Sequence, residues 1–196
     1  YKSIGGWLLT FCLIGIANGQ INEPVKQIPQ FHAEGTWANL PSPWIMAIVS
    51  STWVDETGHL WVLQRPNTLS DQERSQAAPP VLEFDQEGRF LRAWGGPGPG
   101  YDWPESEHGI HVDPEGFVWI GGNGNEDQIL KFTKSGEFIM QIGRGGQPKT
   151  NTDTKNLWRP ADMFVHSETN ELFVADGYGN KRIIVFDAHT GDFKRM

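Results

Sequence analysis

The sequence predicts an all-β fold, a β-propeller of which about three four-stranded blades are present. The chain has 196 residues with 23 Gly and 13 Pro, a composition that favours many turns over long helices. Two short phrases of sequence recur three times in the same order. Trp61 and Trp119 occupy equivalent positions 58 residues apart, and Phe173 follows after 54 more. Four antiparallel strands repeated at about this spacing are typical of propeller blades.

The first recurring phrase is an apolar strand, a tight turn and a second apolar strand. It spans residues 53–62 and 111–120, and a looser third copy with one inserted residue spans 164–174. Asp55 and Asp113 begin the turns, and Gly58 and Gly116 follow three residues later. Asp bonds to nearby main-chain groups and Gly accepts a positive φ, so each copy predicts a hairpin.

The second recurring phrase follows each copy of the first and predicts another hairpin. It spans residues 81–91, 129–139 and 183–193. Together the two phrases place the blades at about 49–95, 108–143 and 160–196. The alternative of a meandering sandwich with similar hairpins stays open. Three blades do not close a propeller, for which 4–8 are typical. We therefore expect either part of a six-bladed chain, with its C-terminal half missing, or a second chain that completes the ring.

The N-terminal residues predict export and a short arm. Residues 1–19 combine Lys2, an apolar run over 4–16 and a small-residue cleavage site, as in a secretory signal peptide. The run is too short to span a membrane, so we expect a secreted or periplasmic protein without a membrane span after cleavage. Residues 20–48 are expected to form an arm, with Trp37 and Trp44 as its anchors.

Charge and cysteine content exclude two classes of protein. The formal net charge is −8 and there is one Cys. A nucleic-acid partner is not expected, because phosphate binding needs a basic face. A disulfide framework is excluded as well. The expected ligand is a small molecule or peptide in the propeller's central funnel.

Three segments resemble a known family in more detail than the recurring hairpin pattern alone. They are residues 58–65, which end in Arg65; residues 108–113, which begin with His108; and residues 173–183, which contain Tyr178 in an Asp-Gly-Tyr-x-Asn-x-Arg pattern. The repeats are similar to NHL repeats, and these segments resemble the lyase half of the peptidylglycine α-amidating enzymes over residues 37–196.

The resemblance implies a lyase that cleaves a peptidyl-α-hydroxyglycine to a peptide amide and glyoxylate. It implies a zinc ion held by three His, of which His108 is one, with Arg65 and Tyr178 as catalytic residues. Neutral imidazole suits zinc, and a positioned Tyr can act as a general base. It also implies a calcium ion on the axis, bound partly by the main-chain carbonyls of Thr52 and Ile110.

This sequence departs from the family pattern in two ways. Two further zinc-binding His are expected beyond residue 196. Trp158 and Gly179 stand where animal lyases carry a disulfide.

Several neighbouring side chains are expected to play no part in the site. His59, His166 and His189 lie in predicted turns and should be solvated. His111 should face away from His108 and Ile110. Glu105 and Glu107 could support His108, but a solvated loop is the favoured interpretation. Arg65 could instead pair with Asp71 or Glu73 at the surface.

A second function class stays open. Many propellers bind without catalysis, because a fold does not determine a function. Trp37, Trp44 and Trp103 would then be platforms for a peptide, glycan or partner protein.

Overall fold

The structure is a computed structural model that describes residues 28–33, 35, 37–124, 127–146 and 150–196. The chain divides into two units, residues 1–33 and 34–196. In the first unit, residues 28–33 form neither helix nor strand, and Ile28 and Phe31 are largely exposed. The predicted signal segment, residues 1–19, lies outside the described residues.

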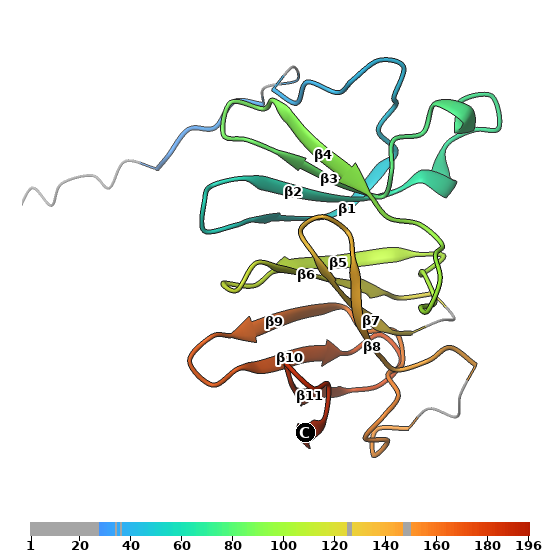
Figure 1. Ribbon diagram of the computed structural model, residues 1–196, viewed down its shortest axis with the longest axis vertical. Helices are drawn as coiled ribbons and strands as arrows, with labels where there is room; N and C mark the ends of the chain where they lie inside the picture. Colours follow the sequence, from blue (N-terminus) through green and yellow to red (C-terminus); the bar gives the residue numbers. More distant parts are fainter. Residues whose placement is uncertain (1–27, 34, 36, 125–126, 147–149) are drawn as a thin grey trace, which may run out of the picture. The chain divides into compact units, whose positions relative to one another are not determined.

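The second unit contains three antiparallel four-stranded sheets, which Figure 1 shows stacked one after another in chain order. The first sheet contains β1 (Ile48–Val54), β2 (Leu60–Arg65), β3 (Val81–Phe84) and β4 (Phe90–Trp94). The second contains β5 (Glu107–Val112), β6 (Phe117–Gly122), β7 (Ile129–Thr133) and β8 (Phe138–Ile142). The third contains β9 (Asp162–His166), β10 (Glu171–Asp176), β11 (Arg182–Asp187) and β12 (Phe193–Arg195). Two short 3₁₀ turns, η1 (Pro66–Thr68) and η2 (Arg74–Gln76), join β2 to β3. The prediction of an all-β fold with three four-stranded blades is confirmed.

Local side-chain bonds close the predicted hairpins. Asp55 Oδ1 accepts the main-chain N–H groups of Thr57 and His59, and Gly58 has a φ of 81°. In the second blade Asp113 Oδ1 accepts the N–H of Phe117, the position equivalent to His59, and Gly116 has a φ of 87°. These turns depend on residues within about four positions of one another, which is why the sequence pattern predicts them.

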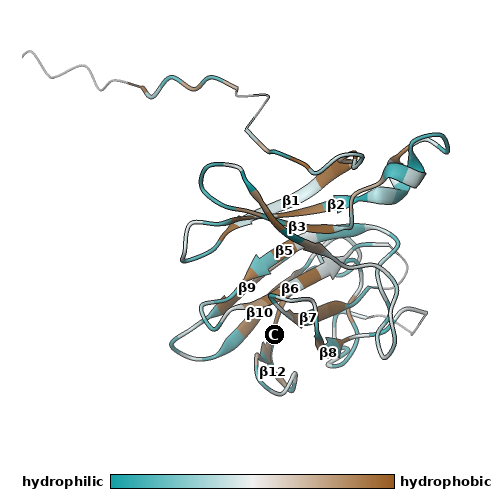
Figure 2. Cartoon of the chain, turned by 45° about the horizontal axis from the view of Figure 1, so that its top comes forward, coloured by the Kyte–Doolittle hydropathy of each residue, from teal (hydrophilic) through white to brown (hydrophobic). Residues whose placement is uncertain are grey.

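The core contains one apolar cluster at each of the two contacts between blades, and a third between the first blade and residues 37–46. The first strand of each sheet lies at its edge, and β5 contacts both β1 and β9. Trp61 belongs to the cluster between the first and second blades, and Trp119 to the cluster between the second and third; both side chains are fully buried. Figure 2 shows the hydrophobic residues on the strands and the hydrophilic ones mainly at the turns. Burial of each such ring contributes about 1.5–3 kcal/mol or more.

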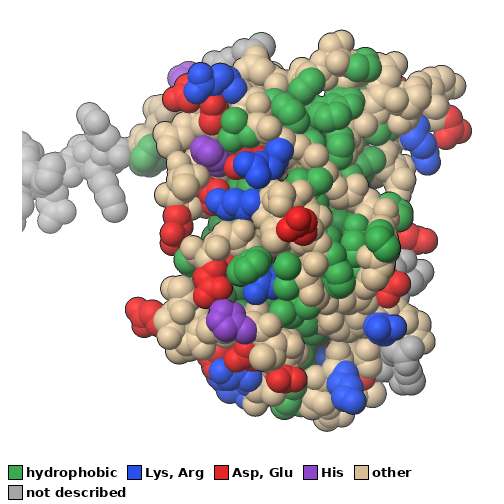
Figure 3. Space-filling view, in the orientation of Figure 1, with side chains coloured by type: hydrophobic (Ala, Val, Ile, Leu, Met, Phe, Trp, Pro, Cys, Tyr) green, Lys and Arg blue, Asp and Glu red, His purple; other side chains and the backbone are tan. Residues whose placement is uncertain are grey.

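Polar contacts also join neighbouring blades. Lys134, from the turn between β7 and β8, donates to Asp55 Oδ2 at 2.8 Å. Burial opposes ionisation of Asp55, but bonds from Lys134, Thr57 and Trp61 outweigh it and hold the pKa of that carboxyl well below its usual range. Figure 3 shows such acidic and basic side chains side by side at the surface.

Residues 37–48 run along the first blade. The Trp37 ring lies 6.1 Å from Phe84, and the Trp44 ring lies 5.6 Å from Phe90, between ring centroids. Both tryptophans are half-buried, as expected of anchors. None of the helices in the described part of the chain is long and apolar enough to cross a membrane.

Candidate functional site

Three segments far apart in the sequence bring the predicted site residues to one end of the blades. The hydroxyl oxygen of Tyr178, in the loop after β10, lies 3.2 Å from Nε2 of His108 on β5. Their rings meet edge to face, with centroids 5.2 Å apart. Arg65, the last residue of β2, donates from Nε to the carbonyl of Glu107 at 2.6 Å, one residue before His108. Tyr178 is 61% exposed, so this end of the blades is open to a ligand.

The hydrogen bonds of His108 determine its tautomer. Its Nδ1 lies 2.8 Å from the carbonyl oxygen of Ala161, which can only accept, so Nδ1 carries the proton. In the neutral ring, Nε2 then carries the lone pair, and the Tyr178 hydroxyl donates to it. A carbonyl behind Nδ1 is also how proteins orient a metal-binding His, because it fixes the ring and leaves Nε2 as the ligand atom.

A β-bulge gives His108 this orientation. Glu107 pairs with Gly122 and Gly109 pairs with Gly121, so His108 is the extra residue of the ladder. Gly109 allows the close approach of β9, since a Cβ there would lie 2.9 Å from Met163 and 3.5 Å from the Ala161 carbonyl.

The same bulge corrects the prediction for His111. Its side chain does face away from Ile110, which packs against Trp61 in the core between the first two blades. However, the main-chain N–H of Val165 on β9 donates to His111 Nε2 at 3.1 Å, so His111 faces the third blade, as His108 does. The extra residue at the bulge shifts the alternation by one position. Burial lowers the pKa of His111 to about 4.

The guanidinium of Arg65 is oriented by a single main-chain bond. Its terminal nitrogens donate to none of the residues that the structure describes, so they remain available for a ligand carboxylate. The alternative of a surface ion pair is not seen. Arg74 is the partner of Asp71, and Ser70 is the partner of Glu73.

A buried polar network holds the loop that carries Tyr178. Asp176 is fully buried and accepts bonds from Asn180, Arg182 and the main-chain N–H of Trp158. Arg182 also donates to the carbonyls of Asn151, Asp153 and Asn156. The acidic, amide and basic members of the Asp-Gly-Tyr-x-Asn-x-Arg pattern therefore position Tyr178 and do not face the ligand side themselves.

Trp158 and Gly179, the positions that the resemblance relates to a disulfide of animal lyases, lie in direct contact. The N–H of Gly179 donates to the Trp158 carbonyl at 3.0 Å, and a Cβ on Gly179 would lie 2.2 Å from the indole ring. The indole therefore packs on the bare face of this glycine.

The interpretation of Glu105 and Glu107 as part of a solvated loop is wrong for Glu107. Its side chain is 2% exposed, it begins β5, and its Oε1 accepts from Trp103 Nε1 at 2.9 Å. Glu105 is exposed, as expected. The sequence signal for the burial of Glu107 is Trp103, a large aromatic residue four positions earlier.

Thr52 and Ile110 occupy equivalent positions in the first two blades. Thr52 pairs with Val62 and Ile110 pairs with Ile120, one residue before the pairs that contain Trp61 and Trp119. The N–H of Ile110 donates to Ser51 Oγ at 3.3 Å, away from β6. In an antiparallel strand the N–H and C=O of a residue point to the same side, so the Ile110 carbonyl also faces the open edge of its sheet.

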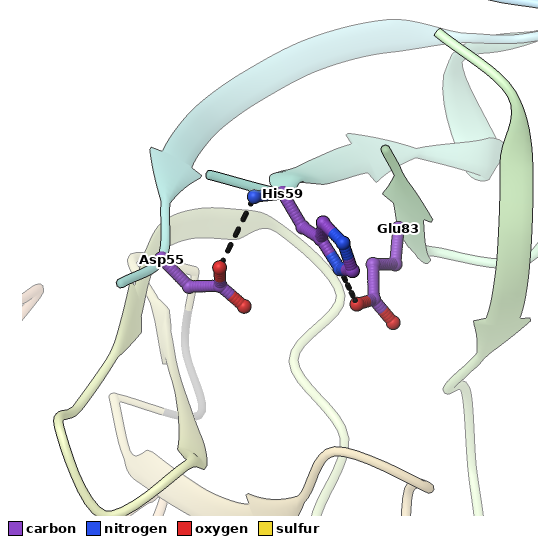
Figure 4. A group of neighbouring side chains, drawn as sticks. All are labelled: Asp55, His59 and Glu83. Atoms are coloured by element: carbon purple, nitrogen blue, oxygen red, sulfur yellow. Dashed lines mark hydrogen bonds and ion pairs between the residues drawn. The ribbon is translucent and has the colours of Figure 1, made fainter. Parts of the chain in front are cut away.

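A second cluster with metal-ligand chemistry lies at the opposite end of the first blade (Figure 4). One ligand atom from each of Asp55, His59 and Glu83 lies within 4.8 Å of the others. Each has protein partners: His59 Nδ1 lies 2.8 Å from Glu83 Oε1, and Arg92 Nε lies 2.5 Å from Glu83 Oε2. Asp55 accepts from the turn, from Trp61 and from Lys134. Each of the three side chains is therefore engaged by protein groups, although Glu83 Oε2 has the ion pair with Arg92 and no hydrogen-bond partner among the described residues. His59 is half-buried and bonded to Glu83, so the expectation that it is solvated is wrong.

The residues near Tyr178 fit the implied zinc ion in part. His108 offers Nε2 with its tautomer already set, which is the donor that zinc prefers. No second His, Cys or carboxylate joins His108 in a metal-binding group within the described ranges. One imidazole of the implied three is thus present.

Comparison with known proteins finds relatives with NHL repeats and amidating lyases. NHL repeat-containing protein 3 of Mus musculus is 29% identical over 120 residues, which is 57% of this chain and 33% of that protein. A probable peptidyl-alpha-hydroxyglycine alpha-amidating lyase of Caenorhabditis elegans is 32% identical over 81 residues, 41% of this chain and 22% of that protein. Peptidyl-glycine alpha-amidating monooxygenase A of Xenopus laevis is 35% identical over 80 residues, 40% of this chain and 8% of that protein. No protein-family model matches the chain.

Two lyases are among the solved structures of similar fold. A streptogramin B lyase aligns with a TM-score of 0.48 at 21% identity, over 74% of this chain and 39% of that one. A virginiamycin B lyase from Staphylococcus aureus aligns with a TM-score of 0.47 at 18% identity, over 76% and 40%. At this identity and TM-score, neither structure informs the chemistry of the site. The chain spans a third or less of the length of the relatives reported above.

Proposed function

We propose that this chain, part of an NHL-type β-propeller similar to the amidating lyases, carries part of the active site of a zinc-assisted lyase. Its substrate would be a peptidyl-α-hydroxyglycine, and its products a peptide amide and glyoxylate. The observation that supports this most is the 3.2 Å contact between the Tyr178 hydroxyl and His108 Nε2. In this contact the Tyr178 hydroxyl donates to Nε2. A metal ion that took over the Nε2 lone pair would leave the tyrosine oxygen beside it, where that oxygen would accept a proton.

Each described residue would have one role. The phenolate oxygen of Tyr178 would accept the proton of the substrate's hydroxyl group. The bond from the α-carbon to the amide nitrogen would break, and its electrons would leave with that nitrogen, which takes up a proton. Arg65 would bind the substrate's carboxylate through its two terminal nitrogens. Zinc bound at His108, with the remaining ligands from elsewhere in the full-length protein, would make the hydroxyl proton more acidic.

The proposal also includes a calcium site and export of the protein. The carbonyl of Ile110 and its equivalent at Thr52 would contribute to a calcium site at the open edges of β5 and β1. The apolar run at residues 4–16 supports a secreted or periplasmic location.

The alternative, a non-catalytic propeller that binds through exposed tryptophans, has less support. Trp37, Trp44 and Trp103 are all half-buried. Each packs against an apolar cluster of the first two blades, so none offers a free ring face comparable to the exposed Tyr178.

Release of glyoxylate from a peptidyl-α-hydroxyglycine by the full-length protein tests the proposal. With zinc present we expect turnover, and Tyr178→Phe should lower kcat by about 10²–10⁴-fold while zinc content stays unchanged. His108→Ala should lose both zinc and turnover. The matched controls are Tyr101→Phe and His189→Ala. The hydroxyl of Tyr101 donates to the Gly96 carbonyl near the core, and His189 lies in an exposed turn. Glyoxylate release that survives both Tyr178→Phe and His108→Ala would exclude the proposed mechanism.

A further inference from the structure

A cavity of about 320 Å³ lies beside Arg65, between the first two blades. Its walls come from the connection between β2 and β3, the connection between β4 and β5, and the first residue of β5. Figure 1 shows both connections at the end of the blades where β10 stops, which is where the loop of Tyr178 begins. Pro66, which follows Arg65, is in the wall, and so is Glu107, whose main-chain carbonyl accepts the bond from Arg65 Nε. The cavity therefore adjoins the candidate active site.

The walls of this cavity are mostly apolar and have little freedom to move. Trp103 is in the wall, and its Nε1 donates to Glu107 Oε1 at 2.9 Å, which fixes the direction of the indole. The proline ring fixes φ, so wall segments that contain proline have few alternative conformations. Four prolines are among the described residues of the wall: Pro66, Pro80, Pro97 and Pro104. A preformed apolar cavity binds an apolar group well, because little of the protein has to be ordered.

Two glycines hold wall residues against the blades. A Cβ on Gly95, which directly follows β4, would lie 2.7 Å from the indole of Trp103. A Cβ on Gly122, the last residue of β6, would lie 2.3 Å from the Cβ of Pro104. Trp103 and Pro104 thus pack closely on bare main chain, and this packing seats one side of the cavity on the first two blades.

The position of the cavity determines which part of a substrate reaches it. The inference rests on the proposed function, in which Arg65 binds the carboxylate of the α-hydroxyglycine. The residue before the α-hydroxyglycine has its Cα only about 3.8 Å from that of the hydroxyglycine, so its side chain lies close to Arg65 as well. A volume of 320 Å³ is at the small end for ligand sites and suits one side chain, and proline and tryptophan walls suit a ring. We propose that this cavity binds the side chain of the residue that precedes the α-hydroxyglycine, and that it selects an apolar, preferably aromatic, side chain.

The test measures binding to the full-length protein with two peptides that cannot react. N-acetyl-phenylalanyl-glycine carries the aromatic side chain, and N-acetyl-glycyl-glycine lacks it, while both carry the carboxylate for Arg65. Isothermal titration calorimetry should show that the phenylalanyl peptide binds about tenfold to a hundredfold more tightly, because its ring leaves water. The two corresponding α-hydroxyglycine substrates should differ in kcat/KM by a similar factor.

A variant that fills the cavity separates it from the rest of the site. Ala77 is in the wall and half-buried, and its N–H donates to the Arg74 carbonyl, a bond that a substitution of the side chain retains. Ala77→Leu should remove the advantage of the phenylalanyl peptide and leave the affinity for the glycyl peptide unchanged. Ala77→Val, a smaller change, should reduce the advantage in part. Ala38→Leu makes the same change at an exposed position outside the cavity and should behave as the wild type.

The outcomes distinguish this inference from the proposed function. The inference is wrong if the two peptides bind wild type equally, if neither binds, or if Ala77→Leu leaves their ratio unchanged. Equal kcat/KM for the two substrates would likewise contradict the inference but leave the lyase function in place. If the phenylalanyl peptide binds more tightly and Ala77→Leu abolishes the difference, yet neither substrate releases glyoxylate, the cavity is assigned correctly and the proposed function is wrong.

Discussion

His108 and His111 show how much depends on single hydrogen bonds. Both rings carry their proton on Nδ1 and both face the third blade, yet only one presents a free Nε2. The main chain of β9 occupies Nε2 of His111, whereas Nε2 of His108 meets only a hydroxyl that a ligand can displace. At the scale of the residue, therefore, β9 decides which of the two histidines keeps an Nε2 that a ligand can reach.

Arg65 provides a test at the same scale. If its terminal nitrogens bind the substrate carboxylate, Arg65→Met should raise KM about tenfold to a hundredfold, because a bond between charged groups is lost. Arg74→Met is the matched control, since Arg74 lies in the same connection and pairs with Asp71 at the surface. The measurement is the KM for an α-hydroxyglycine substrate and for its methyl ester. A role in carboxylate binding predicts that the ester is insensitive to Arg65→Met, and equal losses on both substrates would contradict it.

At the scale of the element, the loop after β10 is held by charges that are almost fully removed from water. The Arg182 side chain is 6% exposed and lies 2.9 Å from Asp176, which is fully buried. By contrast, Arg89 pairs with Asp85 at 2.6 Å but is 72% exposed. Screening by solvent makes an exposed pair weak, whereas breaking a buried pair leaves an uncompensated charge.

Arg182→Met should therefore lower the free energy of unfolding by about 3–5 kcal/mol, and Arg89→Met by less than about 1 kcal/mol. Urea denaturation of the full-length protein measures both. Hydrogen exchange at the N–H of Tyr178, which donates to the Arg159 carbonyl, should accelerate in Arg182→Met and stay unchanged in Arg89→Met. If the two variants lose equal stability, the network is not what holds this loop.

At the scale of the whole molecule, the three blades are held by apolar clusters between sheets and by carboxylates that pair with bases. Glu171 on β10 accepts a two-pronged bond from Arg195 on β12, at 2.6 and 2.8 Å. Arg195, with Lys194 and Thr169, lowers the pKa of Glu171 from 4.5 to about 2. Because the folded-state pKa lies below the unfolded one, this pair stabilises the fold above about pH 4.5. The contribution is lost as the pH falls toward 2.

The thermal midpoint of wild type and Glu171→Gln, followed from pH 7 to pH 2, checks this expectation. The two midpoints should differ most at pH 6–7 and converge between about pH 4.5 and 2. Glu168→Gln changes an exposed carboxylate three residues before the start of β10, so it serves as the control and should track the wild type. A difference that is constant across the whole range would mean that the ion pair does not cause the pH dependence.

The sequence by itself determined the blades, because each hairpin depends on contacts within about ten residues. Asp55 with Gly58, and Asp113 with Gly116, form the turns that their spacing predicts. The resemblance of three segments to the amidating lyases also predicted Arg65, His108 and Tyr178 as site residues, and the fold brings these three to one end of the blades.

Only the tertiary structure decided what surrounds those residues. The bulge at His108 and the partners of His59 and His111 all involve contacts across strands or blades, 12 to 54 positions apart in the sequence. One extra residue in a strand reverses the side on which later side chains lie, and no local pattern records that shift. The direction of each imidazole, and hence its chemistry, follows from where the neighbouring blade places its main-chain carbonyls and N–H groups.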